Sequence, residues 1–496
     1  MAPPLPLTFL PSPTTALTWF PPATRYLTAS LRHDPGLQVE ESAAPVEIFV
    51  DSFRAHRRLV RGRPAESTLE AYSRQPMLLC PHLDVAAGRY DRKIVEAAPA
   101  ETVLLSALTV FDLYVARVLL NAGKRVALGG NLTTLYSTAR LRSLLAGLGC
   151  DAGRLERDLV VLSGLVTPAT RLSPLLEAWK DAPIPLADPA SMFGPVEDVL
   201  LPHAPLVQAI SGRSMIALPL STGCWWGACE FCTVRNQPSV DLAAGVEPSH
   251  VVAHLHALAA AYDCRDLVLT DNYLRLTDPV KAVLRARGDL KVTVYSGVRL
   301  LADPEFVEAL DPLVDGLRIG VESGSDFALG QARKGFTFAE TERAIQNLAE
   351  RFDPAKKLSL LIVFDLPHES VDDVRRGYER LCALKTRLAD AGFRRVSVSG
   401  FPLLAFPDTA MLSSSPQLEE APPSQIPDEE LCGASVLSRW WERAHGVALP
   451  TSLATLMAAY RRRDRSGAAM PSDLRIIEPA TLAFLEGRGG SDVQTS

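Results

Sequence analysis

The chain has 496 residues, of which 47% are hydrophobic, and a formal net charge of −6. At about 150 residues per domain this length predicts about three domains, and the apolar content allows each domain a buried core. The weak negative charge excludes a general electrostatic attraction to nucleic acid or to an anionic membrane.

The same sequence gives no sign of export or of membrane insertion. No uninterrupted run of 18 apolar residues is present, and the proline-rich N-terminus lacks the basic start of a signal peptide. Apart from one trio, the eight cysteines are scattered, which is not the pattern of a secreted disulfide framework. We therefore expect a cytoplasmic protein.

Residues 1–185 alternate short apolar runs with amphipathic ones, the pattern of a doubly wound α/β sheet. The expected elements in chain order are strand 101–109, helix 111–121, strand 125–130, helix 134–148 and strand 158–163. Such sheets bind ligands at the carboxyl ends of their strands. The candidates at these ends are Ser106, Thr109, Gly129, Gly130 and Asn131. Two tight turns without a ligand are the alternative interpretation of the glycines.

A proline-rich segment at 181–189 predicts an extended connection, and we assign residues 186–212 to a linker. Residues 413–496 are expected to be a small helical extension, with a flexible connection, helices over 428–445 and 451–463, and a disordered tail. Trp440 and Trp441 in the first of these helices could cover a site in the preceding domain.

The most informative motif is the trio Cys224, Cys229 and Cys232, spaced Cys-x4-Cys-x2-Cys. Three thiolates on one loop can hold a 4Fe–4S cluster and leave one iron free to bind a small molecule. Glycines and aromatic residues inside the loop would allow the chain to curl and would exclude water; they are Gly223, Gly227, Trp225, Trp226 and Phe231.

A zinc site or three structural thiols are the alternatives to a cluster. A closed zinc site needs a fourth cysteine or histidine, normally in a second pair downstream, and no such pair follows. His250 and His254 are the nearest candidates, and their spacing is that of an ordinary amphipathic helix. The remaining cysteines are expected to be small buried hydrophobic residues.

Residues 213–412 predict a partial (β/α)6 barrel, because short apolar runs again alternate with amphipathic segments. The six expected strands are Met215–Leu220, Asp266–Thr270, Lys291–Tyr295, Gly316–Val321, Leu358–Phe364 and Arg395–Ser399. Chemistry in such barrels lies at the carboxyl ends of the strands. The polar candidates there are Asp271, Asn272, Arg299, Glu322, Ser323 and Glu369.

This arrangement resembles the radical S-adenosylmethionine (SAM) superfamily. The usual motif is Cys-x3-Cys-x2-Cys with an aromatic residue before the last cysteine, as Phe231 is here, so this loop carries one extra residue. Four further segments resemble superfamily elements in the expected order: 269–275, 320–326, 363–370 and 401–409. The resemblance implies that the cysteine trio binds the cluster and that the six polar candidates contact SAM. Helix caps and loop ion pairs are the alternative roles for those six.

A Rossmann-like domain placed before such a barrel resembles the cobalamin-binding members of the superfamily. Their serine after the third strand and Gly-Gly turn after the fourth are matched by Ser106 and Gly129-Gly130, which implies that the five N-terminal candidates contact cobalamin. Residues 163–166 depart from the usual Gly-Glu-Gly-Glu, and no Asp-x-His-x-x-Gly motif supplies a histidine to cobalt. A domain that no longer binds cobalamin is the alternative.

The resemblance implies a C-methyltransferase that acts on an unactivated carbon and takes electrons from an external donor such as flavodoxin or ferredoxin. No catalytic residue beyond the cluster can be assigned. The run Gly-Cys-Trp-Trp-Gly at 223–227 resembles maturases of ribosomally made peptides, which suggests a peptide or another specialised metabolite as substrate. A nonmethylating radical enzyme with the same cofactors and a noncatalytic cobalamin- or metal-binding regulator are the alternatives.

Overall fold

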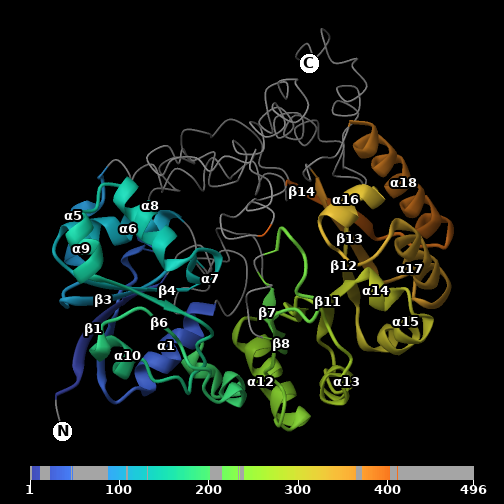
Figure 1. Cartoon of the computed structure of the whole chain (residues 1–496). Coiled ribbons are helices and arrows are strands. Elements are labelled where there is room, and N and C mark those ends of the chain that lie inside the picture. Colours follow the sequence, from blue (N-terminus) through green and yellow to red (C-terminus); the bar gives the residue numbers. More distant parts are fainter. Residues whose placement is uncertain are drawn as a thin grey trace, which may run out of the picture.

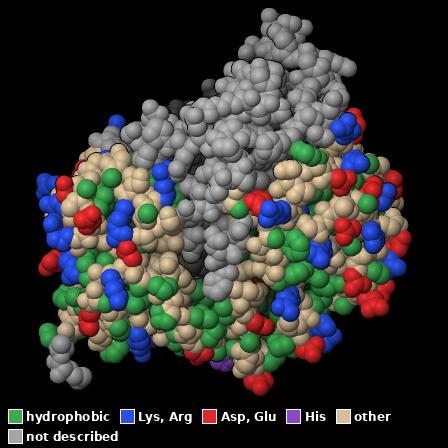
Figure 2. All heavy atoms as spheres, viewed as in Figure 1, with side chains coloured by type: hydrophobic (Ala, Val, Ile, Leu, Met, Phe, Trp, Pro, Cys, Tyr) green, Lys and Arg blue, Asp and Glu red, His purple; other side chains and the backbone are tan. Residues whose placement is uncertain are grey.

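The structure is a computed structural model, and it describes residues 3–11, 23–45, 47–48, 88–107, 110–130, 132–200, 215–232, 234, 239–364, 371–402 and 410. These residues form two α/β units, each built around one six-stranded sheet (Figure 1). Within the described ranges, no helix is both long and apolar enough to cross a membrane. Figure 2 shows acidic and basic side chains interspersed over the visible described surface.

The first sheet is parallel, with strand order β2-β1-β3-β4-β5-β6. Its strands are β1 (Leu5–Leu10), β2 (Leu37–Glu41), β3 (Thr102–Ser106), β4 (Arg125–Gly129), β5 (Leu159–Ser163) and β6 (Ala182–Pro183). Its helices are α1 (Ala23–His33), α5 (Asp91–Glu96), α6 (Val110–Asn121), α7 (Leu132–Leu135), α8 (Thr138–Gly147), α9 (Ala152–Arg157) and α10 (Ser173–Ala178). The predicted doubly wound sheet is confirmed.

Two separate cores cover the two faces of this sheet. Val103 and Leu105 of β3 lie in the core shared with α6 and α8, whereas Leu104 between them lies in the core shared with α1 and α10. Successive side chains of a strand point to opposite faces, so a strand buried on both sides is apolar throughout. This is why the sequence predicted β3 from a continuous apolar run.

The single helix expected over 134–148 is two helices instead, α7 and α8. Ser137 separates them in an extended conformation, and its side chain accepts a hydrogen bond from Arg140 N at 3.3 Å, which makes it the N-cap of α8. Within the proline-rich segment, Ala182–Pro183 is extended as expected and adds β6 to the sheet.

The second sheet is also parallel, with order β14-β13-β12-β11-β10-β7. The strands are β7 (Ile216–Leu218), β10 (Asp266–Leu269), β11 (Lys291–Gly297), β12 (Gly316–Glu322), β13 (Lys357–Phe364) and β14 (Val396–Pro402). The helices are α12 (Pro248–Ala261), α13 (Asp278–Arg285), α14 (Val298–Leu301), α15 (Pro304–Leu310), α16 (Asp326–Gln331), α17 (Phe338–Arg351) and α18 (Val371–Asp390). All six predicted strands are present, in an open sheet whose edges are β7 and β14.

The chain between the two sheets packs against both units. After β6 it forms two 3-10 helices, η2 (Pro189–Phe193) and η3 (Val196–Asp198). Met192 and Phe193 are buried in the core of the second unit, and Tyr26 of α1 joins the same core. Burial of these apolar side chains makes this part of the predicted linker a packed connection.

Asp34, just after α1, is expected to stabilise the first unit strongly. It is buried and accepts hydrogen bonds from Leu172 N, Ser173 N and Ser173 Oγ at 2.7 to 2.8 Å. Burial by itself raises the pKa of Asp34, but the bonds from Ser173, Gly36 and Leu172 outweigh it and the pKa is lowered. Asp34→Ala should lower the free energy of unfolding by about 3 kcal/mol at neutral pH, because buried donors lose their acceptor.

The effect should also depend on pH. A carboxylate with a lowered pKa contributes stability above its ordinary pKa and loses it as the pH falls through the lowered value. Urea unfolding should therefore show that the difference in the free energy of unfolding between wild type and Asp34→Ala becomes smaller as the pH is lowered. Glu156→Ala, at an exposed position of α9, is the control and should have little effect. If this difference in the free energy of unfolding stays constant with pH, Asp34 is not the charged acceptor described above.

Candidate functional site

The three cysteines lie in a loop at the carboxyl end of β7. The loop begins with a short antiparallel ribbon, β8 (Ser221–Thr222) with β9 (Val240–Asp241). Gly223 and Gly227 have φ angles of 74° and 57°, in the left-handed region that favours glycine. These two residues therefore turn the chain as predicted.

The three thiols form one electrostatic group. All three are free, and burial, with contributions from Cys232 and Cys224, raises the pKa of Cys229 to about 11. Burial raises the pKa of Cys232 as well. Buried thiols of this kind become thiolates when a metal binds them.

The group offers three thiols as possible metal ligands. In the part of the chain that the structure describes, no three His, Cys, Asp or Glu side chains lie close enough to hold one ion. A cubane differs from a single ion because each cysteine binds a different iron. Cys224, Cys229 and Cys232 supply the three thiolates that such a cluster requires.

The two histidines considered as zinc ligands have other partners. His250 Nε2 lies 2.9 Å from Phe193 O, and His254 Nδ1 lies 2.9 Å from Gly194 O. Both histidines belong to α12, so these contacts attach the helix to the segment between the two sheets. The four-residue spacing of the two histidines therefore places both of them against the segment between the sheets and does not indicate a zinc site.

Asp271 and Asn272 follow β10 and contact the cysteine loop. Asp271 is 1% exposed, and its carboxylate accepts hydrogen bonds from Leu220 N at 2.9 Å and Ser221 Oγ at 2.6 Å. Asn272 Nδ2 donates to Gly223 O at 3.3 Å. Burial raises the pKa of Asp271, although the hydrogen bonds oppose this. Both residues tie the start of the loop to β10.

Arg299 contacts the two tryptophans of the loop. Its guanidinium carbon lies 5.4 Å from the ring centre of Trp225 and 4.6 Å from that of Trp226. The ring of Tyr273 meets Trp225 edge to face at 5.0 Å, and Trp225 remains 40% exposed. The loop after β10 and helix α14 after β11 thus form an aromatic and cationic wall beside Cys224.

Glu322 ends β12 in a strained conformation and forms a buried ion pair. Its φ is 65°, which is unusual for a residue other than glycine, and the register of β12 with β13 shifts here. Its carboxylate lies 2.8 Å from Lys334 Nζ, and both side chains are 14% exposed. We did not predict Lys334 from the sequence, because no local pattern marks a residue that follows α16 as part of the site.

Ser323 and the next residues form a self-bonded turn after Glu322. Ser323 Oγ accepts from Ser325 N at 3.0 Å, and Ser325 Oγ accepts from Ala328 N at 3.3 Å as the N-cap of α16. Ser323 is 5% exposed. The turn is therefore held in shape by its own side chains.

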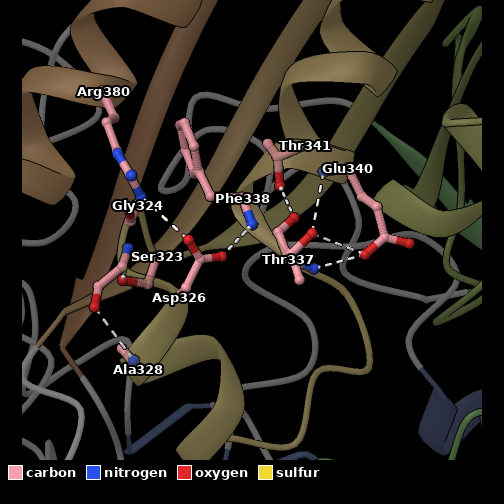
Figure 3. Close-up of polar contacts among 10 residues, drawn as sticks. Ser323, Gly324, Asp326, Ala328, Thr337, Phe338, Glu340, Thr341 and Arg380 are labelled. Atoms are coloured by element: carbon pink, nitrogen blue, oxygen red, sulfur yellow. Dashed lines mark hydrogen bonds and ion pairs between the residues drawn. The ribbon is translucent and has the colours of Figure 1, made fainter.

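Helix α18 fixes the same turn from outside (Figure 3). Arg380 Nη1 donates to Gly324 O at 3.0 Å and lies 3.4 Å from Asp326 Oδ2, and Asp326 Oδ1 accepts from Phe338 N at 2.6 Å. Gly324 packs directly on Gly377, since a Cβ on Gly324 would lie 2.2 Å from Gly377 O. This contact requires glycine at position 324, whereas a Cβ on Gly377 would come no closer than 3.4 Å to Gly324.

In the first unit, Ser106 and the two glycines meet at the carboxyl ends of β3 and β4. Ala107 N donates to Gly129 O at 2.7 Å. Gly130 has a φ of 97°, and a Cβ there would lie 2.6 Å from Ala107 O and 3.2 Å from Ser106 Oγ. A side chain at Gly130 would therefore clash with the end of β3.

Several predicted residues lie outside the described residues. They are Thr109, Asn131, Glu369, and Trp440 and Trp441 with the two C-terminal helices. Their roles stay predictions.

Comparisons with known proteins identify the second unit by sequence and match the fold of the chain to solved structures. Residues 218–381 match the model of the radical SAM superfamily. No curated protein matches the chain. The structure is similar to the cobalamin-dependent S-adenosylmethionine radical enzyme OxsB with aqua-cobalamin and S-adenosylmethionine bound, at a TM-score of 0.55 and 12% identity over 93% of this chain and 71% of OxsB. A radical SAM methyltransferase, TsrM from Kitasatospora setae, gives a TM-score of 0.49 and 16% identity over 84% of this chain and 77% of TsrM.

The open parallel barrel with three free thiols at its carboxyl edge is thus a radical SAM domain. Residues 218–381 thus form a domain of the radical SAM superfamily, and the fold of the chain as a whole is similar to that of OxsB. The cofactors of this class are a 4Fe–4S cluster and SAM, and the cysteine trio fits the cluster.

The aromatic wall should depend on a glycine at position 297. A Cβ on Gly297 would lie 2.2 Å from the ring of Tyr273, so Gly297→Ala must displace that ring from Trp225. We expect a loss of about 2 kcal/mol in the free energy of unfolding and a changed tryptophan fluorescence. Chemical denaturation and emission spectra measure both.

Gly330→Ala is the matched control, because a Cβ at Gly330 in α16 meets nothing within 4 Å. Alanine there should leave the fluorescence unchanged and stabilise the helix by up to about 1 kcal/mol. If the two variants behave alike, Gly297 does not position the wall.

Proposed function

We propose that the protein is a cobalamin-dependent C-methyltransferase that methylates an unactivated carbon of a peptide or specialised metabolite. The observation that carries this proposal is the pairing of two sites on one chain: a three-thiol loop on a radical SAM barrel, and a Gly-Gly turn at the carboxyl end of β4 in a doubly wound sheet. When bound, the cluster and SAM supply a radical that removes a substrate hydrogen, and cobalamin supplies the methyl group.

The cobalamin part of the proposal is supported by fold and by local shape. OxsB, whose structure contains aqua-cobalamin and SAM, shares the two-unit fold. Gly129 and Gly130 leave the end of β4 without side chains, and Ser106 at the end of β3 offers a hydroxyl. These features suit a bulky cofactor that approaches the backbone closely. Thr109 and Asn131 complete the proposed cobalamin set.

For SAM, we propose two kinds of residue. Glu322, Ser323, Arg299 and Glu369 would meet SAM with charged or hydroxyl groups, which its ammonium, carboxylate and ribose require. Asp271 and Asn272 would act through the cysteine loop, since their side chains already bond to Leu220, Ser221 and Gly223.

A nonmethylating radical reaction is the second candidate. It is favoured by one observation, namely that OxsB, the similar structure with a TM-score above 0.5, is described as a radical enzyme and not as a methyltransferase. The mass of the product separates the two functions, because methylation adds one methylene per turnover. A noncatalytic regulator would form no 5′-deoxyadenosine at all.

We also propose a reducing cytoplasmic setting and an external one-electron donor such as flavodoxin or ferredoxin. The cysteines whose side chains the structure describes are free thiols, which suits such a setting: Cys150, Cys224, Cys229, Cys232 and Cys264.

Replacing Cys224, Cys229 or Cys232 singly by alanine should reduce cluster content and 5′-deoxyadenosine formation to background. The reason is that two thiolates cannot hold the cubane. Iron and sulfide analysis after anaerobic reconstitution, followed by assay with SAM and a strong reductant, measures both. Cys150→Ala, at a buried thiol of the first unit, should retain both properties. Normal cluster content in any of the three variants would refute the assignment.

Gly130→Ala should weaken cobalamin binding at least about tenfold, because the new Cβ collides with Ala107 O and the φ of 97° strains it. Cobalamin retained after gel filtration, measured by absorbance, tests this. Gly149→Ala is the control: its φ is 93°, but its Cβ would meet nothing within 4 Å. It carries the same backbone strain and should bind cobalamin normally. Normal binding by Gly130→Ala would remove this turn from the cobalamin site.

A further inference from the structure

A short segment after α16, Ala332–Phe336, holds the cysteine loop in place, and we refer to it as the brace. Glu230 N donates to Ala332 O at 3.1 Å, and Trp226 Nε1 donates to Arg333 O at 2.8 Å. Arg333 Nε also lies 2.9 Å from Glu230 Oε1. The brace therefore contacts both sides of Cys229.

The brace also accommodates the extra residue in the first cysteine interval. Gly335 has a φ of 70°, and a Cβ there would lie 2.1 Å from the indole of Trp226. Trp226 belongs to the x4 interval, and its ring occupies the space that Gly335 leaves. The four-residue interval between Cys224 and Cys229 thus requires a glycine at position 335, because the ring of Trp226 fills the space that a side chain there would need.

The brace places one buried cation, Lys334, beside the loop. Its Nζ lies 2.8 Å from Glu322 Oε1, 5.5 Å from the ring centre of Phe231 and 5.9 Å from that of Phe336. Phe231 directly precedes Cys232. The ammonium is therefore held on one side by a carboxylate and on the other by aromatic faces.

Lys334 is poorly solvated and lies against a chain neighbour of one of the thiols. Its side chain and that of Glu322 are each 14% exposed. Its ammonium contacts the ring of Phe231, the residue before Cys232. Lys334 is therefore a fixed positive charge beside the cysteine loop.

We propose that Lys334 is a positioning residue that sets the reduction potential of the cluster. This inference rests on the proposed function, because it takes the cysteine trio to hold a cluster. Reduction by the external donor adds one electron to an already negative, thiolate-bound centre. A fixed cation in a poorly solvated site stabilises that added charge. Lys334 therefore favours the reduced cluster before any SAM binds.

The test is a redox titration of the reconstituted full-length protein without SAM, followed by the EPR signal of the reduced cluster. In Lys334→Gln the ratio of reduced to oxidised cluster at a given potential should fall about tenfold, which is 59 mV for a one-electron couple. Glu322→Gln should shift the ratio in the opposite direction, because the cation loses its counter-charge. Lys334→Arg should stay close to wild type.

Arg343→Gln removes an exposed cation of α17 and is the control for net charge. It should leave the potential unchanged. If Lys334→Gln assembles no cluster, the opposite shift in Glu322→Gln still decides the question.

The outcomes separate the inference from the proposed function. If wild type binds no iron and sulfide, the proposed function fails. If the clusters assemble and the potentials of Lys334→Gln and Glu322→Gln equal that of wild type, only the inference fails. Weaker SAM binding by Lys334→Gln with an unchanged potential would also overturn it, since the lysine would then serve SAM.

Discussion

Over residues 223–232, all of which the structure describes, the cysteine loop forms no helix or strand, so contacts from other segments must hold its three thiols in place. Asp271 and Asn272 fix its start, and the brace fixes its middle through Trp226 and Glu230. The bond from Leu220 N to Asp271 is buried and is therefore costly to break, because its loss leaves an unsatisfied polar group. The geometry of any bound cluster depends on these contacts.

The two units are joined by packing as well as by the chain. Tyr26 of α1 and Phe193 of the connection lie in the core of the second unit, and α12 bonds to the same connection through two histidines. An apolar contact of this kind resists sliding between units, because movement would expose it to water. The arrangement suits chemistry that requires two cofactor sites in fixed relation.

Polar residues at the carboxyl ends of the strands serve structure and site together. Asp271 looked like a free ligand in the sequence, yet both of its oxygens are used inside the protein. Glu322 is held in a strained conformation by Lys334, and the turn after it is held by Arg380. Strain of this kind persists only where the surroundings hold it, and it gathers at functional sites.

The sequence by itself determined the parallel strands, the cysteine motif and the positive-φ glycines of its loop, because these are encoded in local patterns. A strand buried on both faces is a continuous apolar run, and three cysteines on one loop need no distant partner. Only the tertiary structure decided that a helix breaks at Ser137 and that His250 and His254 bind backbone carbonyls. It also decided that Lys334 contacts Glu322 and Phe231 beside the cysteines. Contacts between residues far apart in the chain leave no periodic signal, since they depend on which loops the folded sheet brings to the same edge.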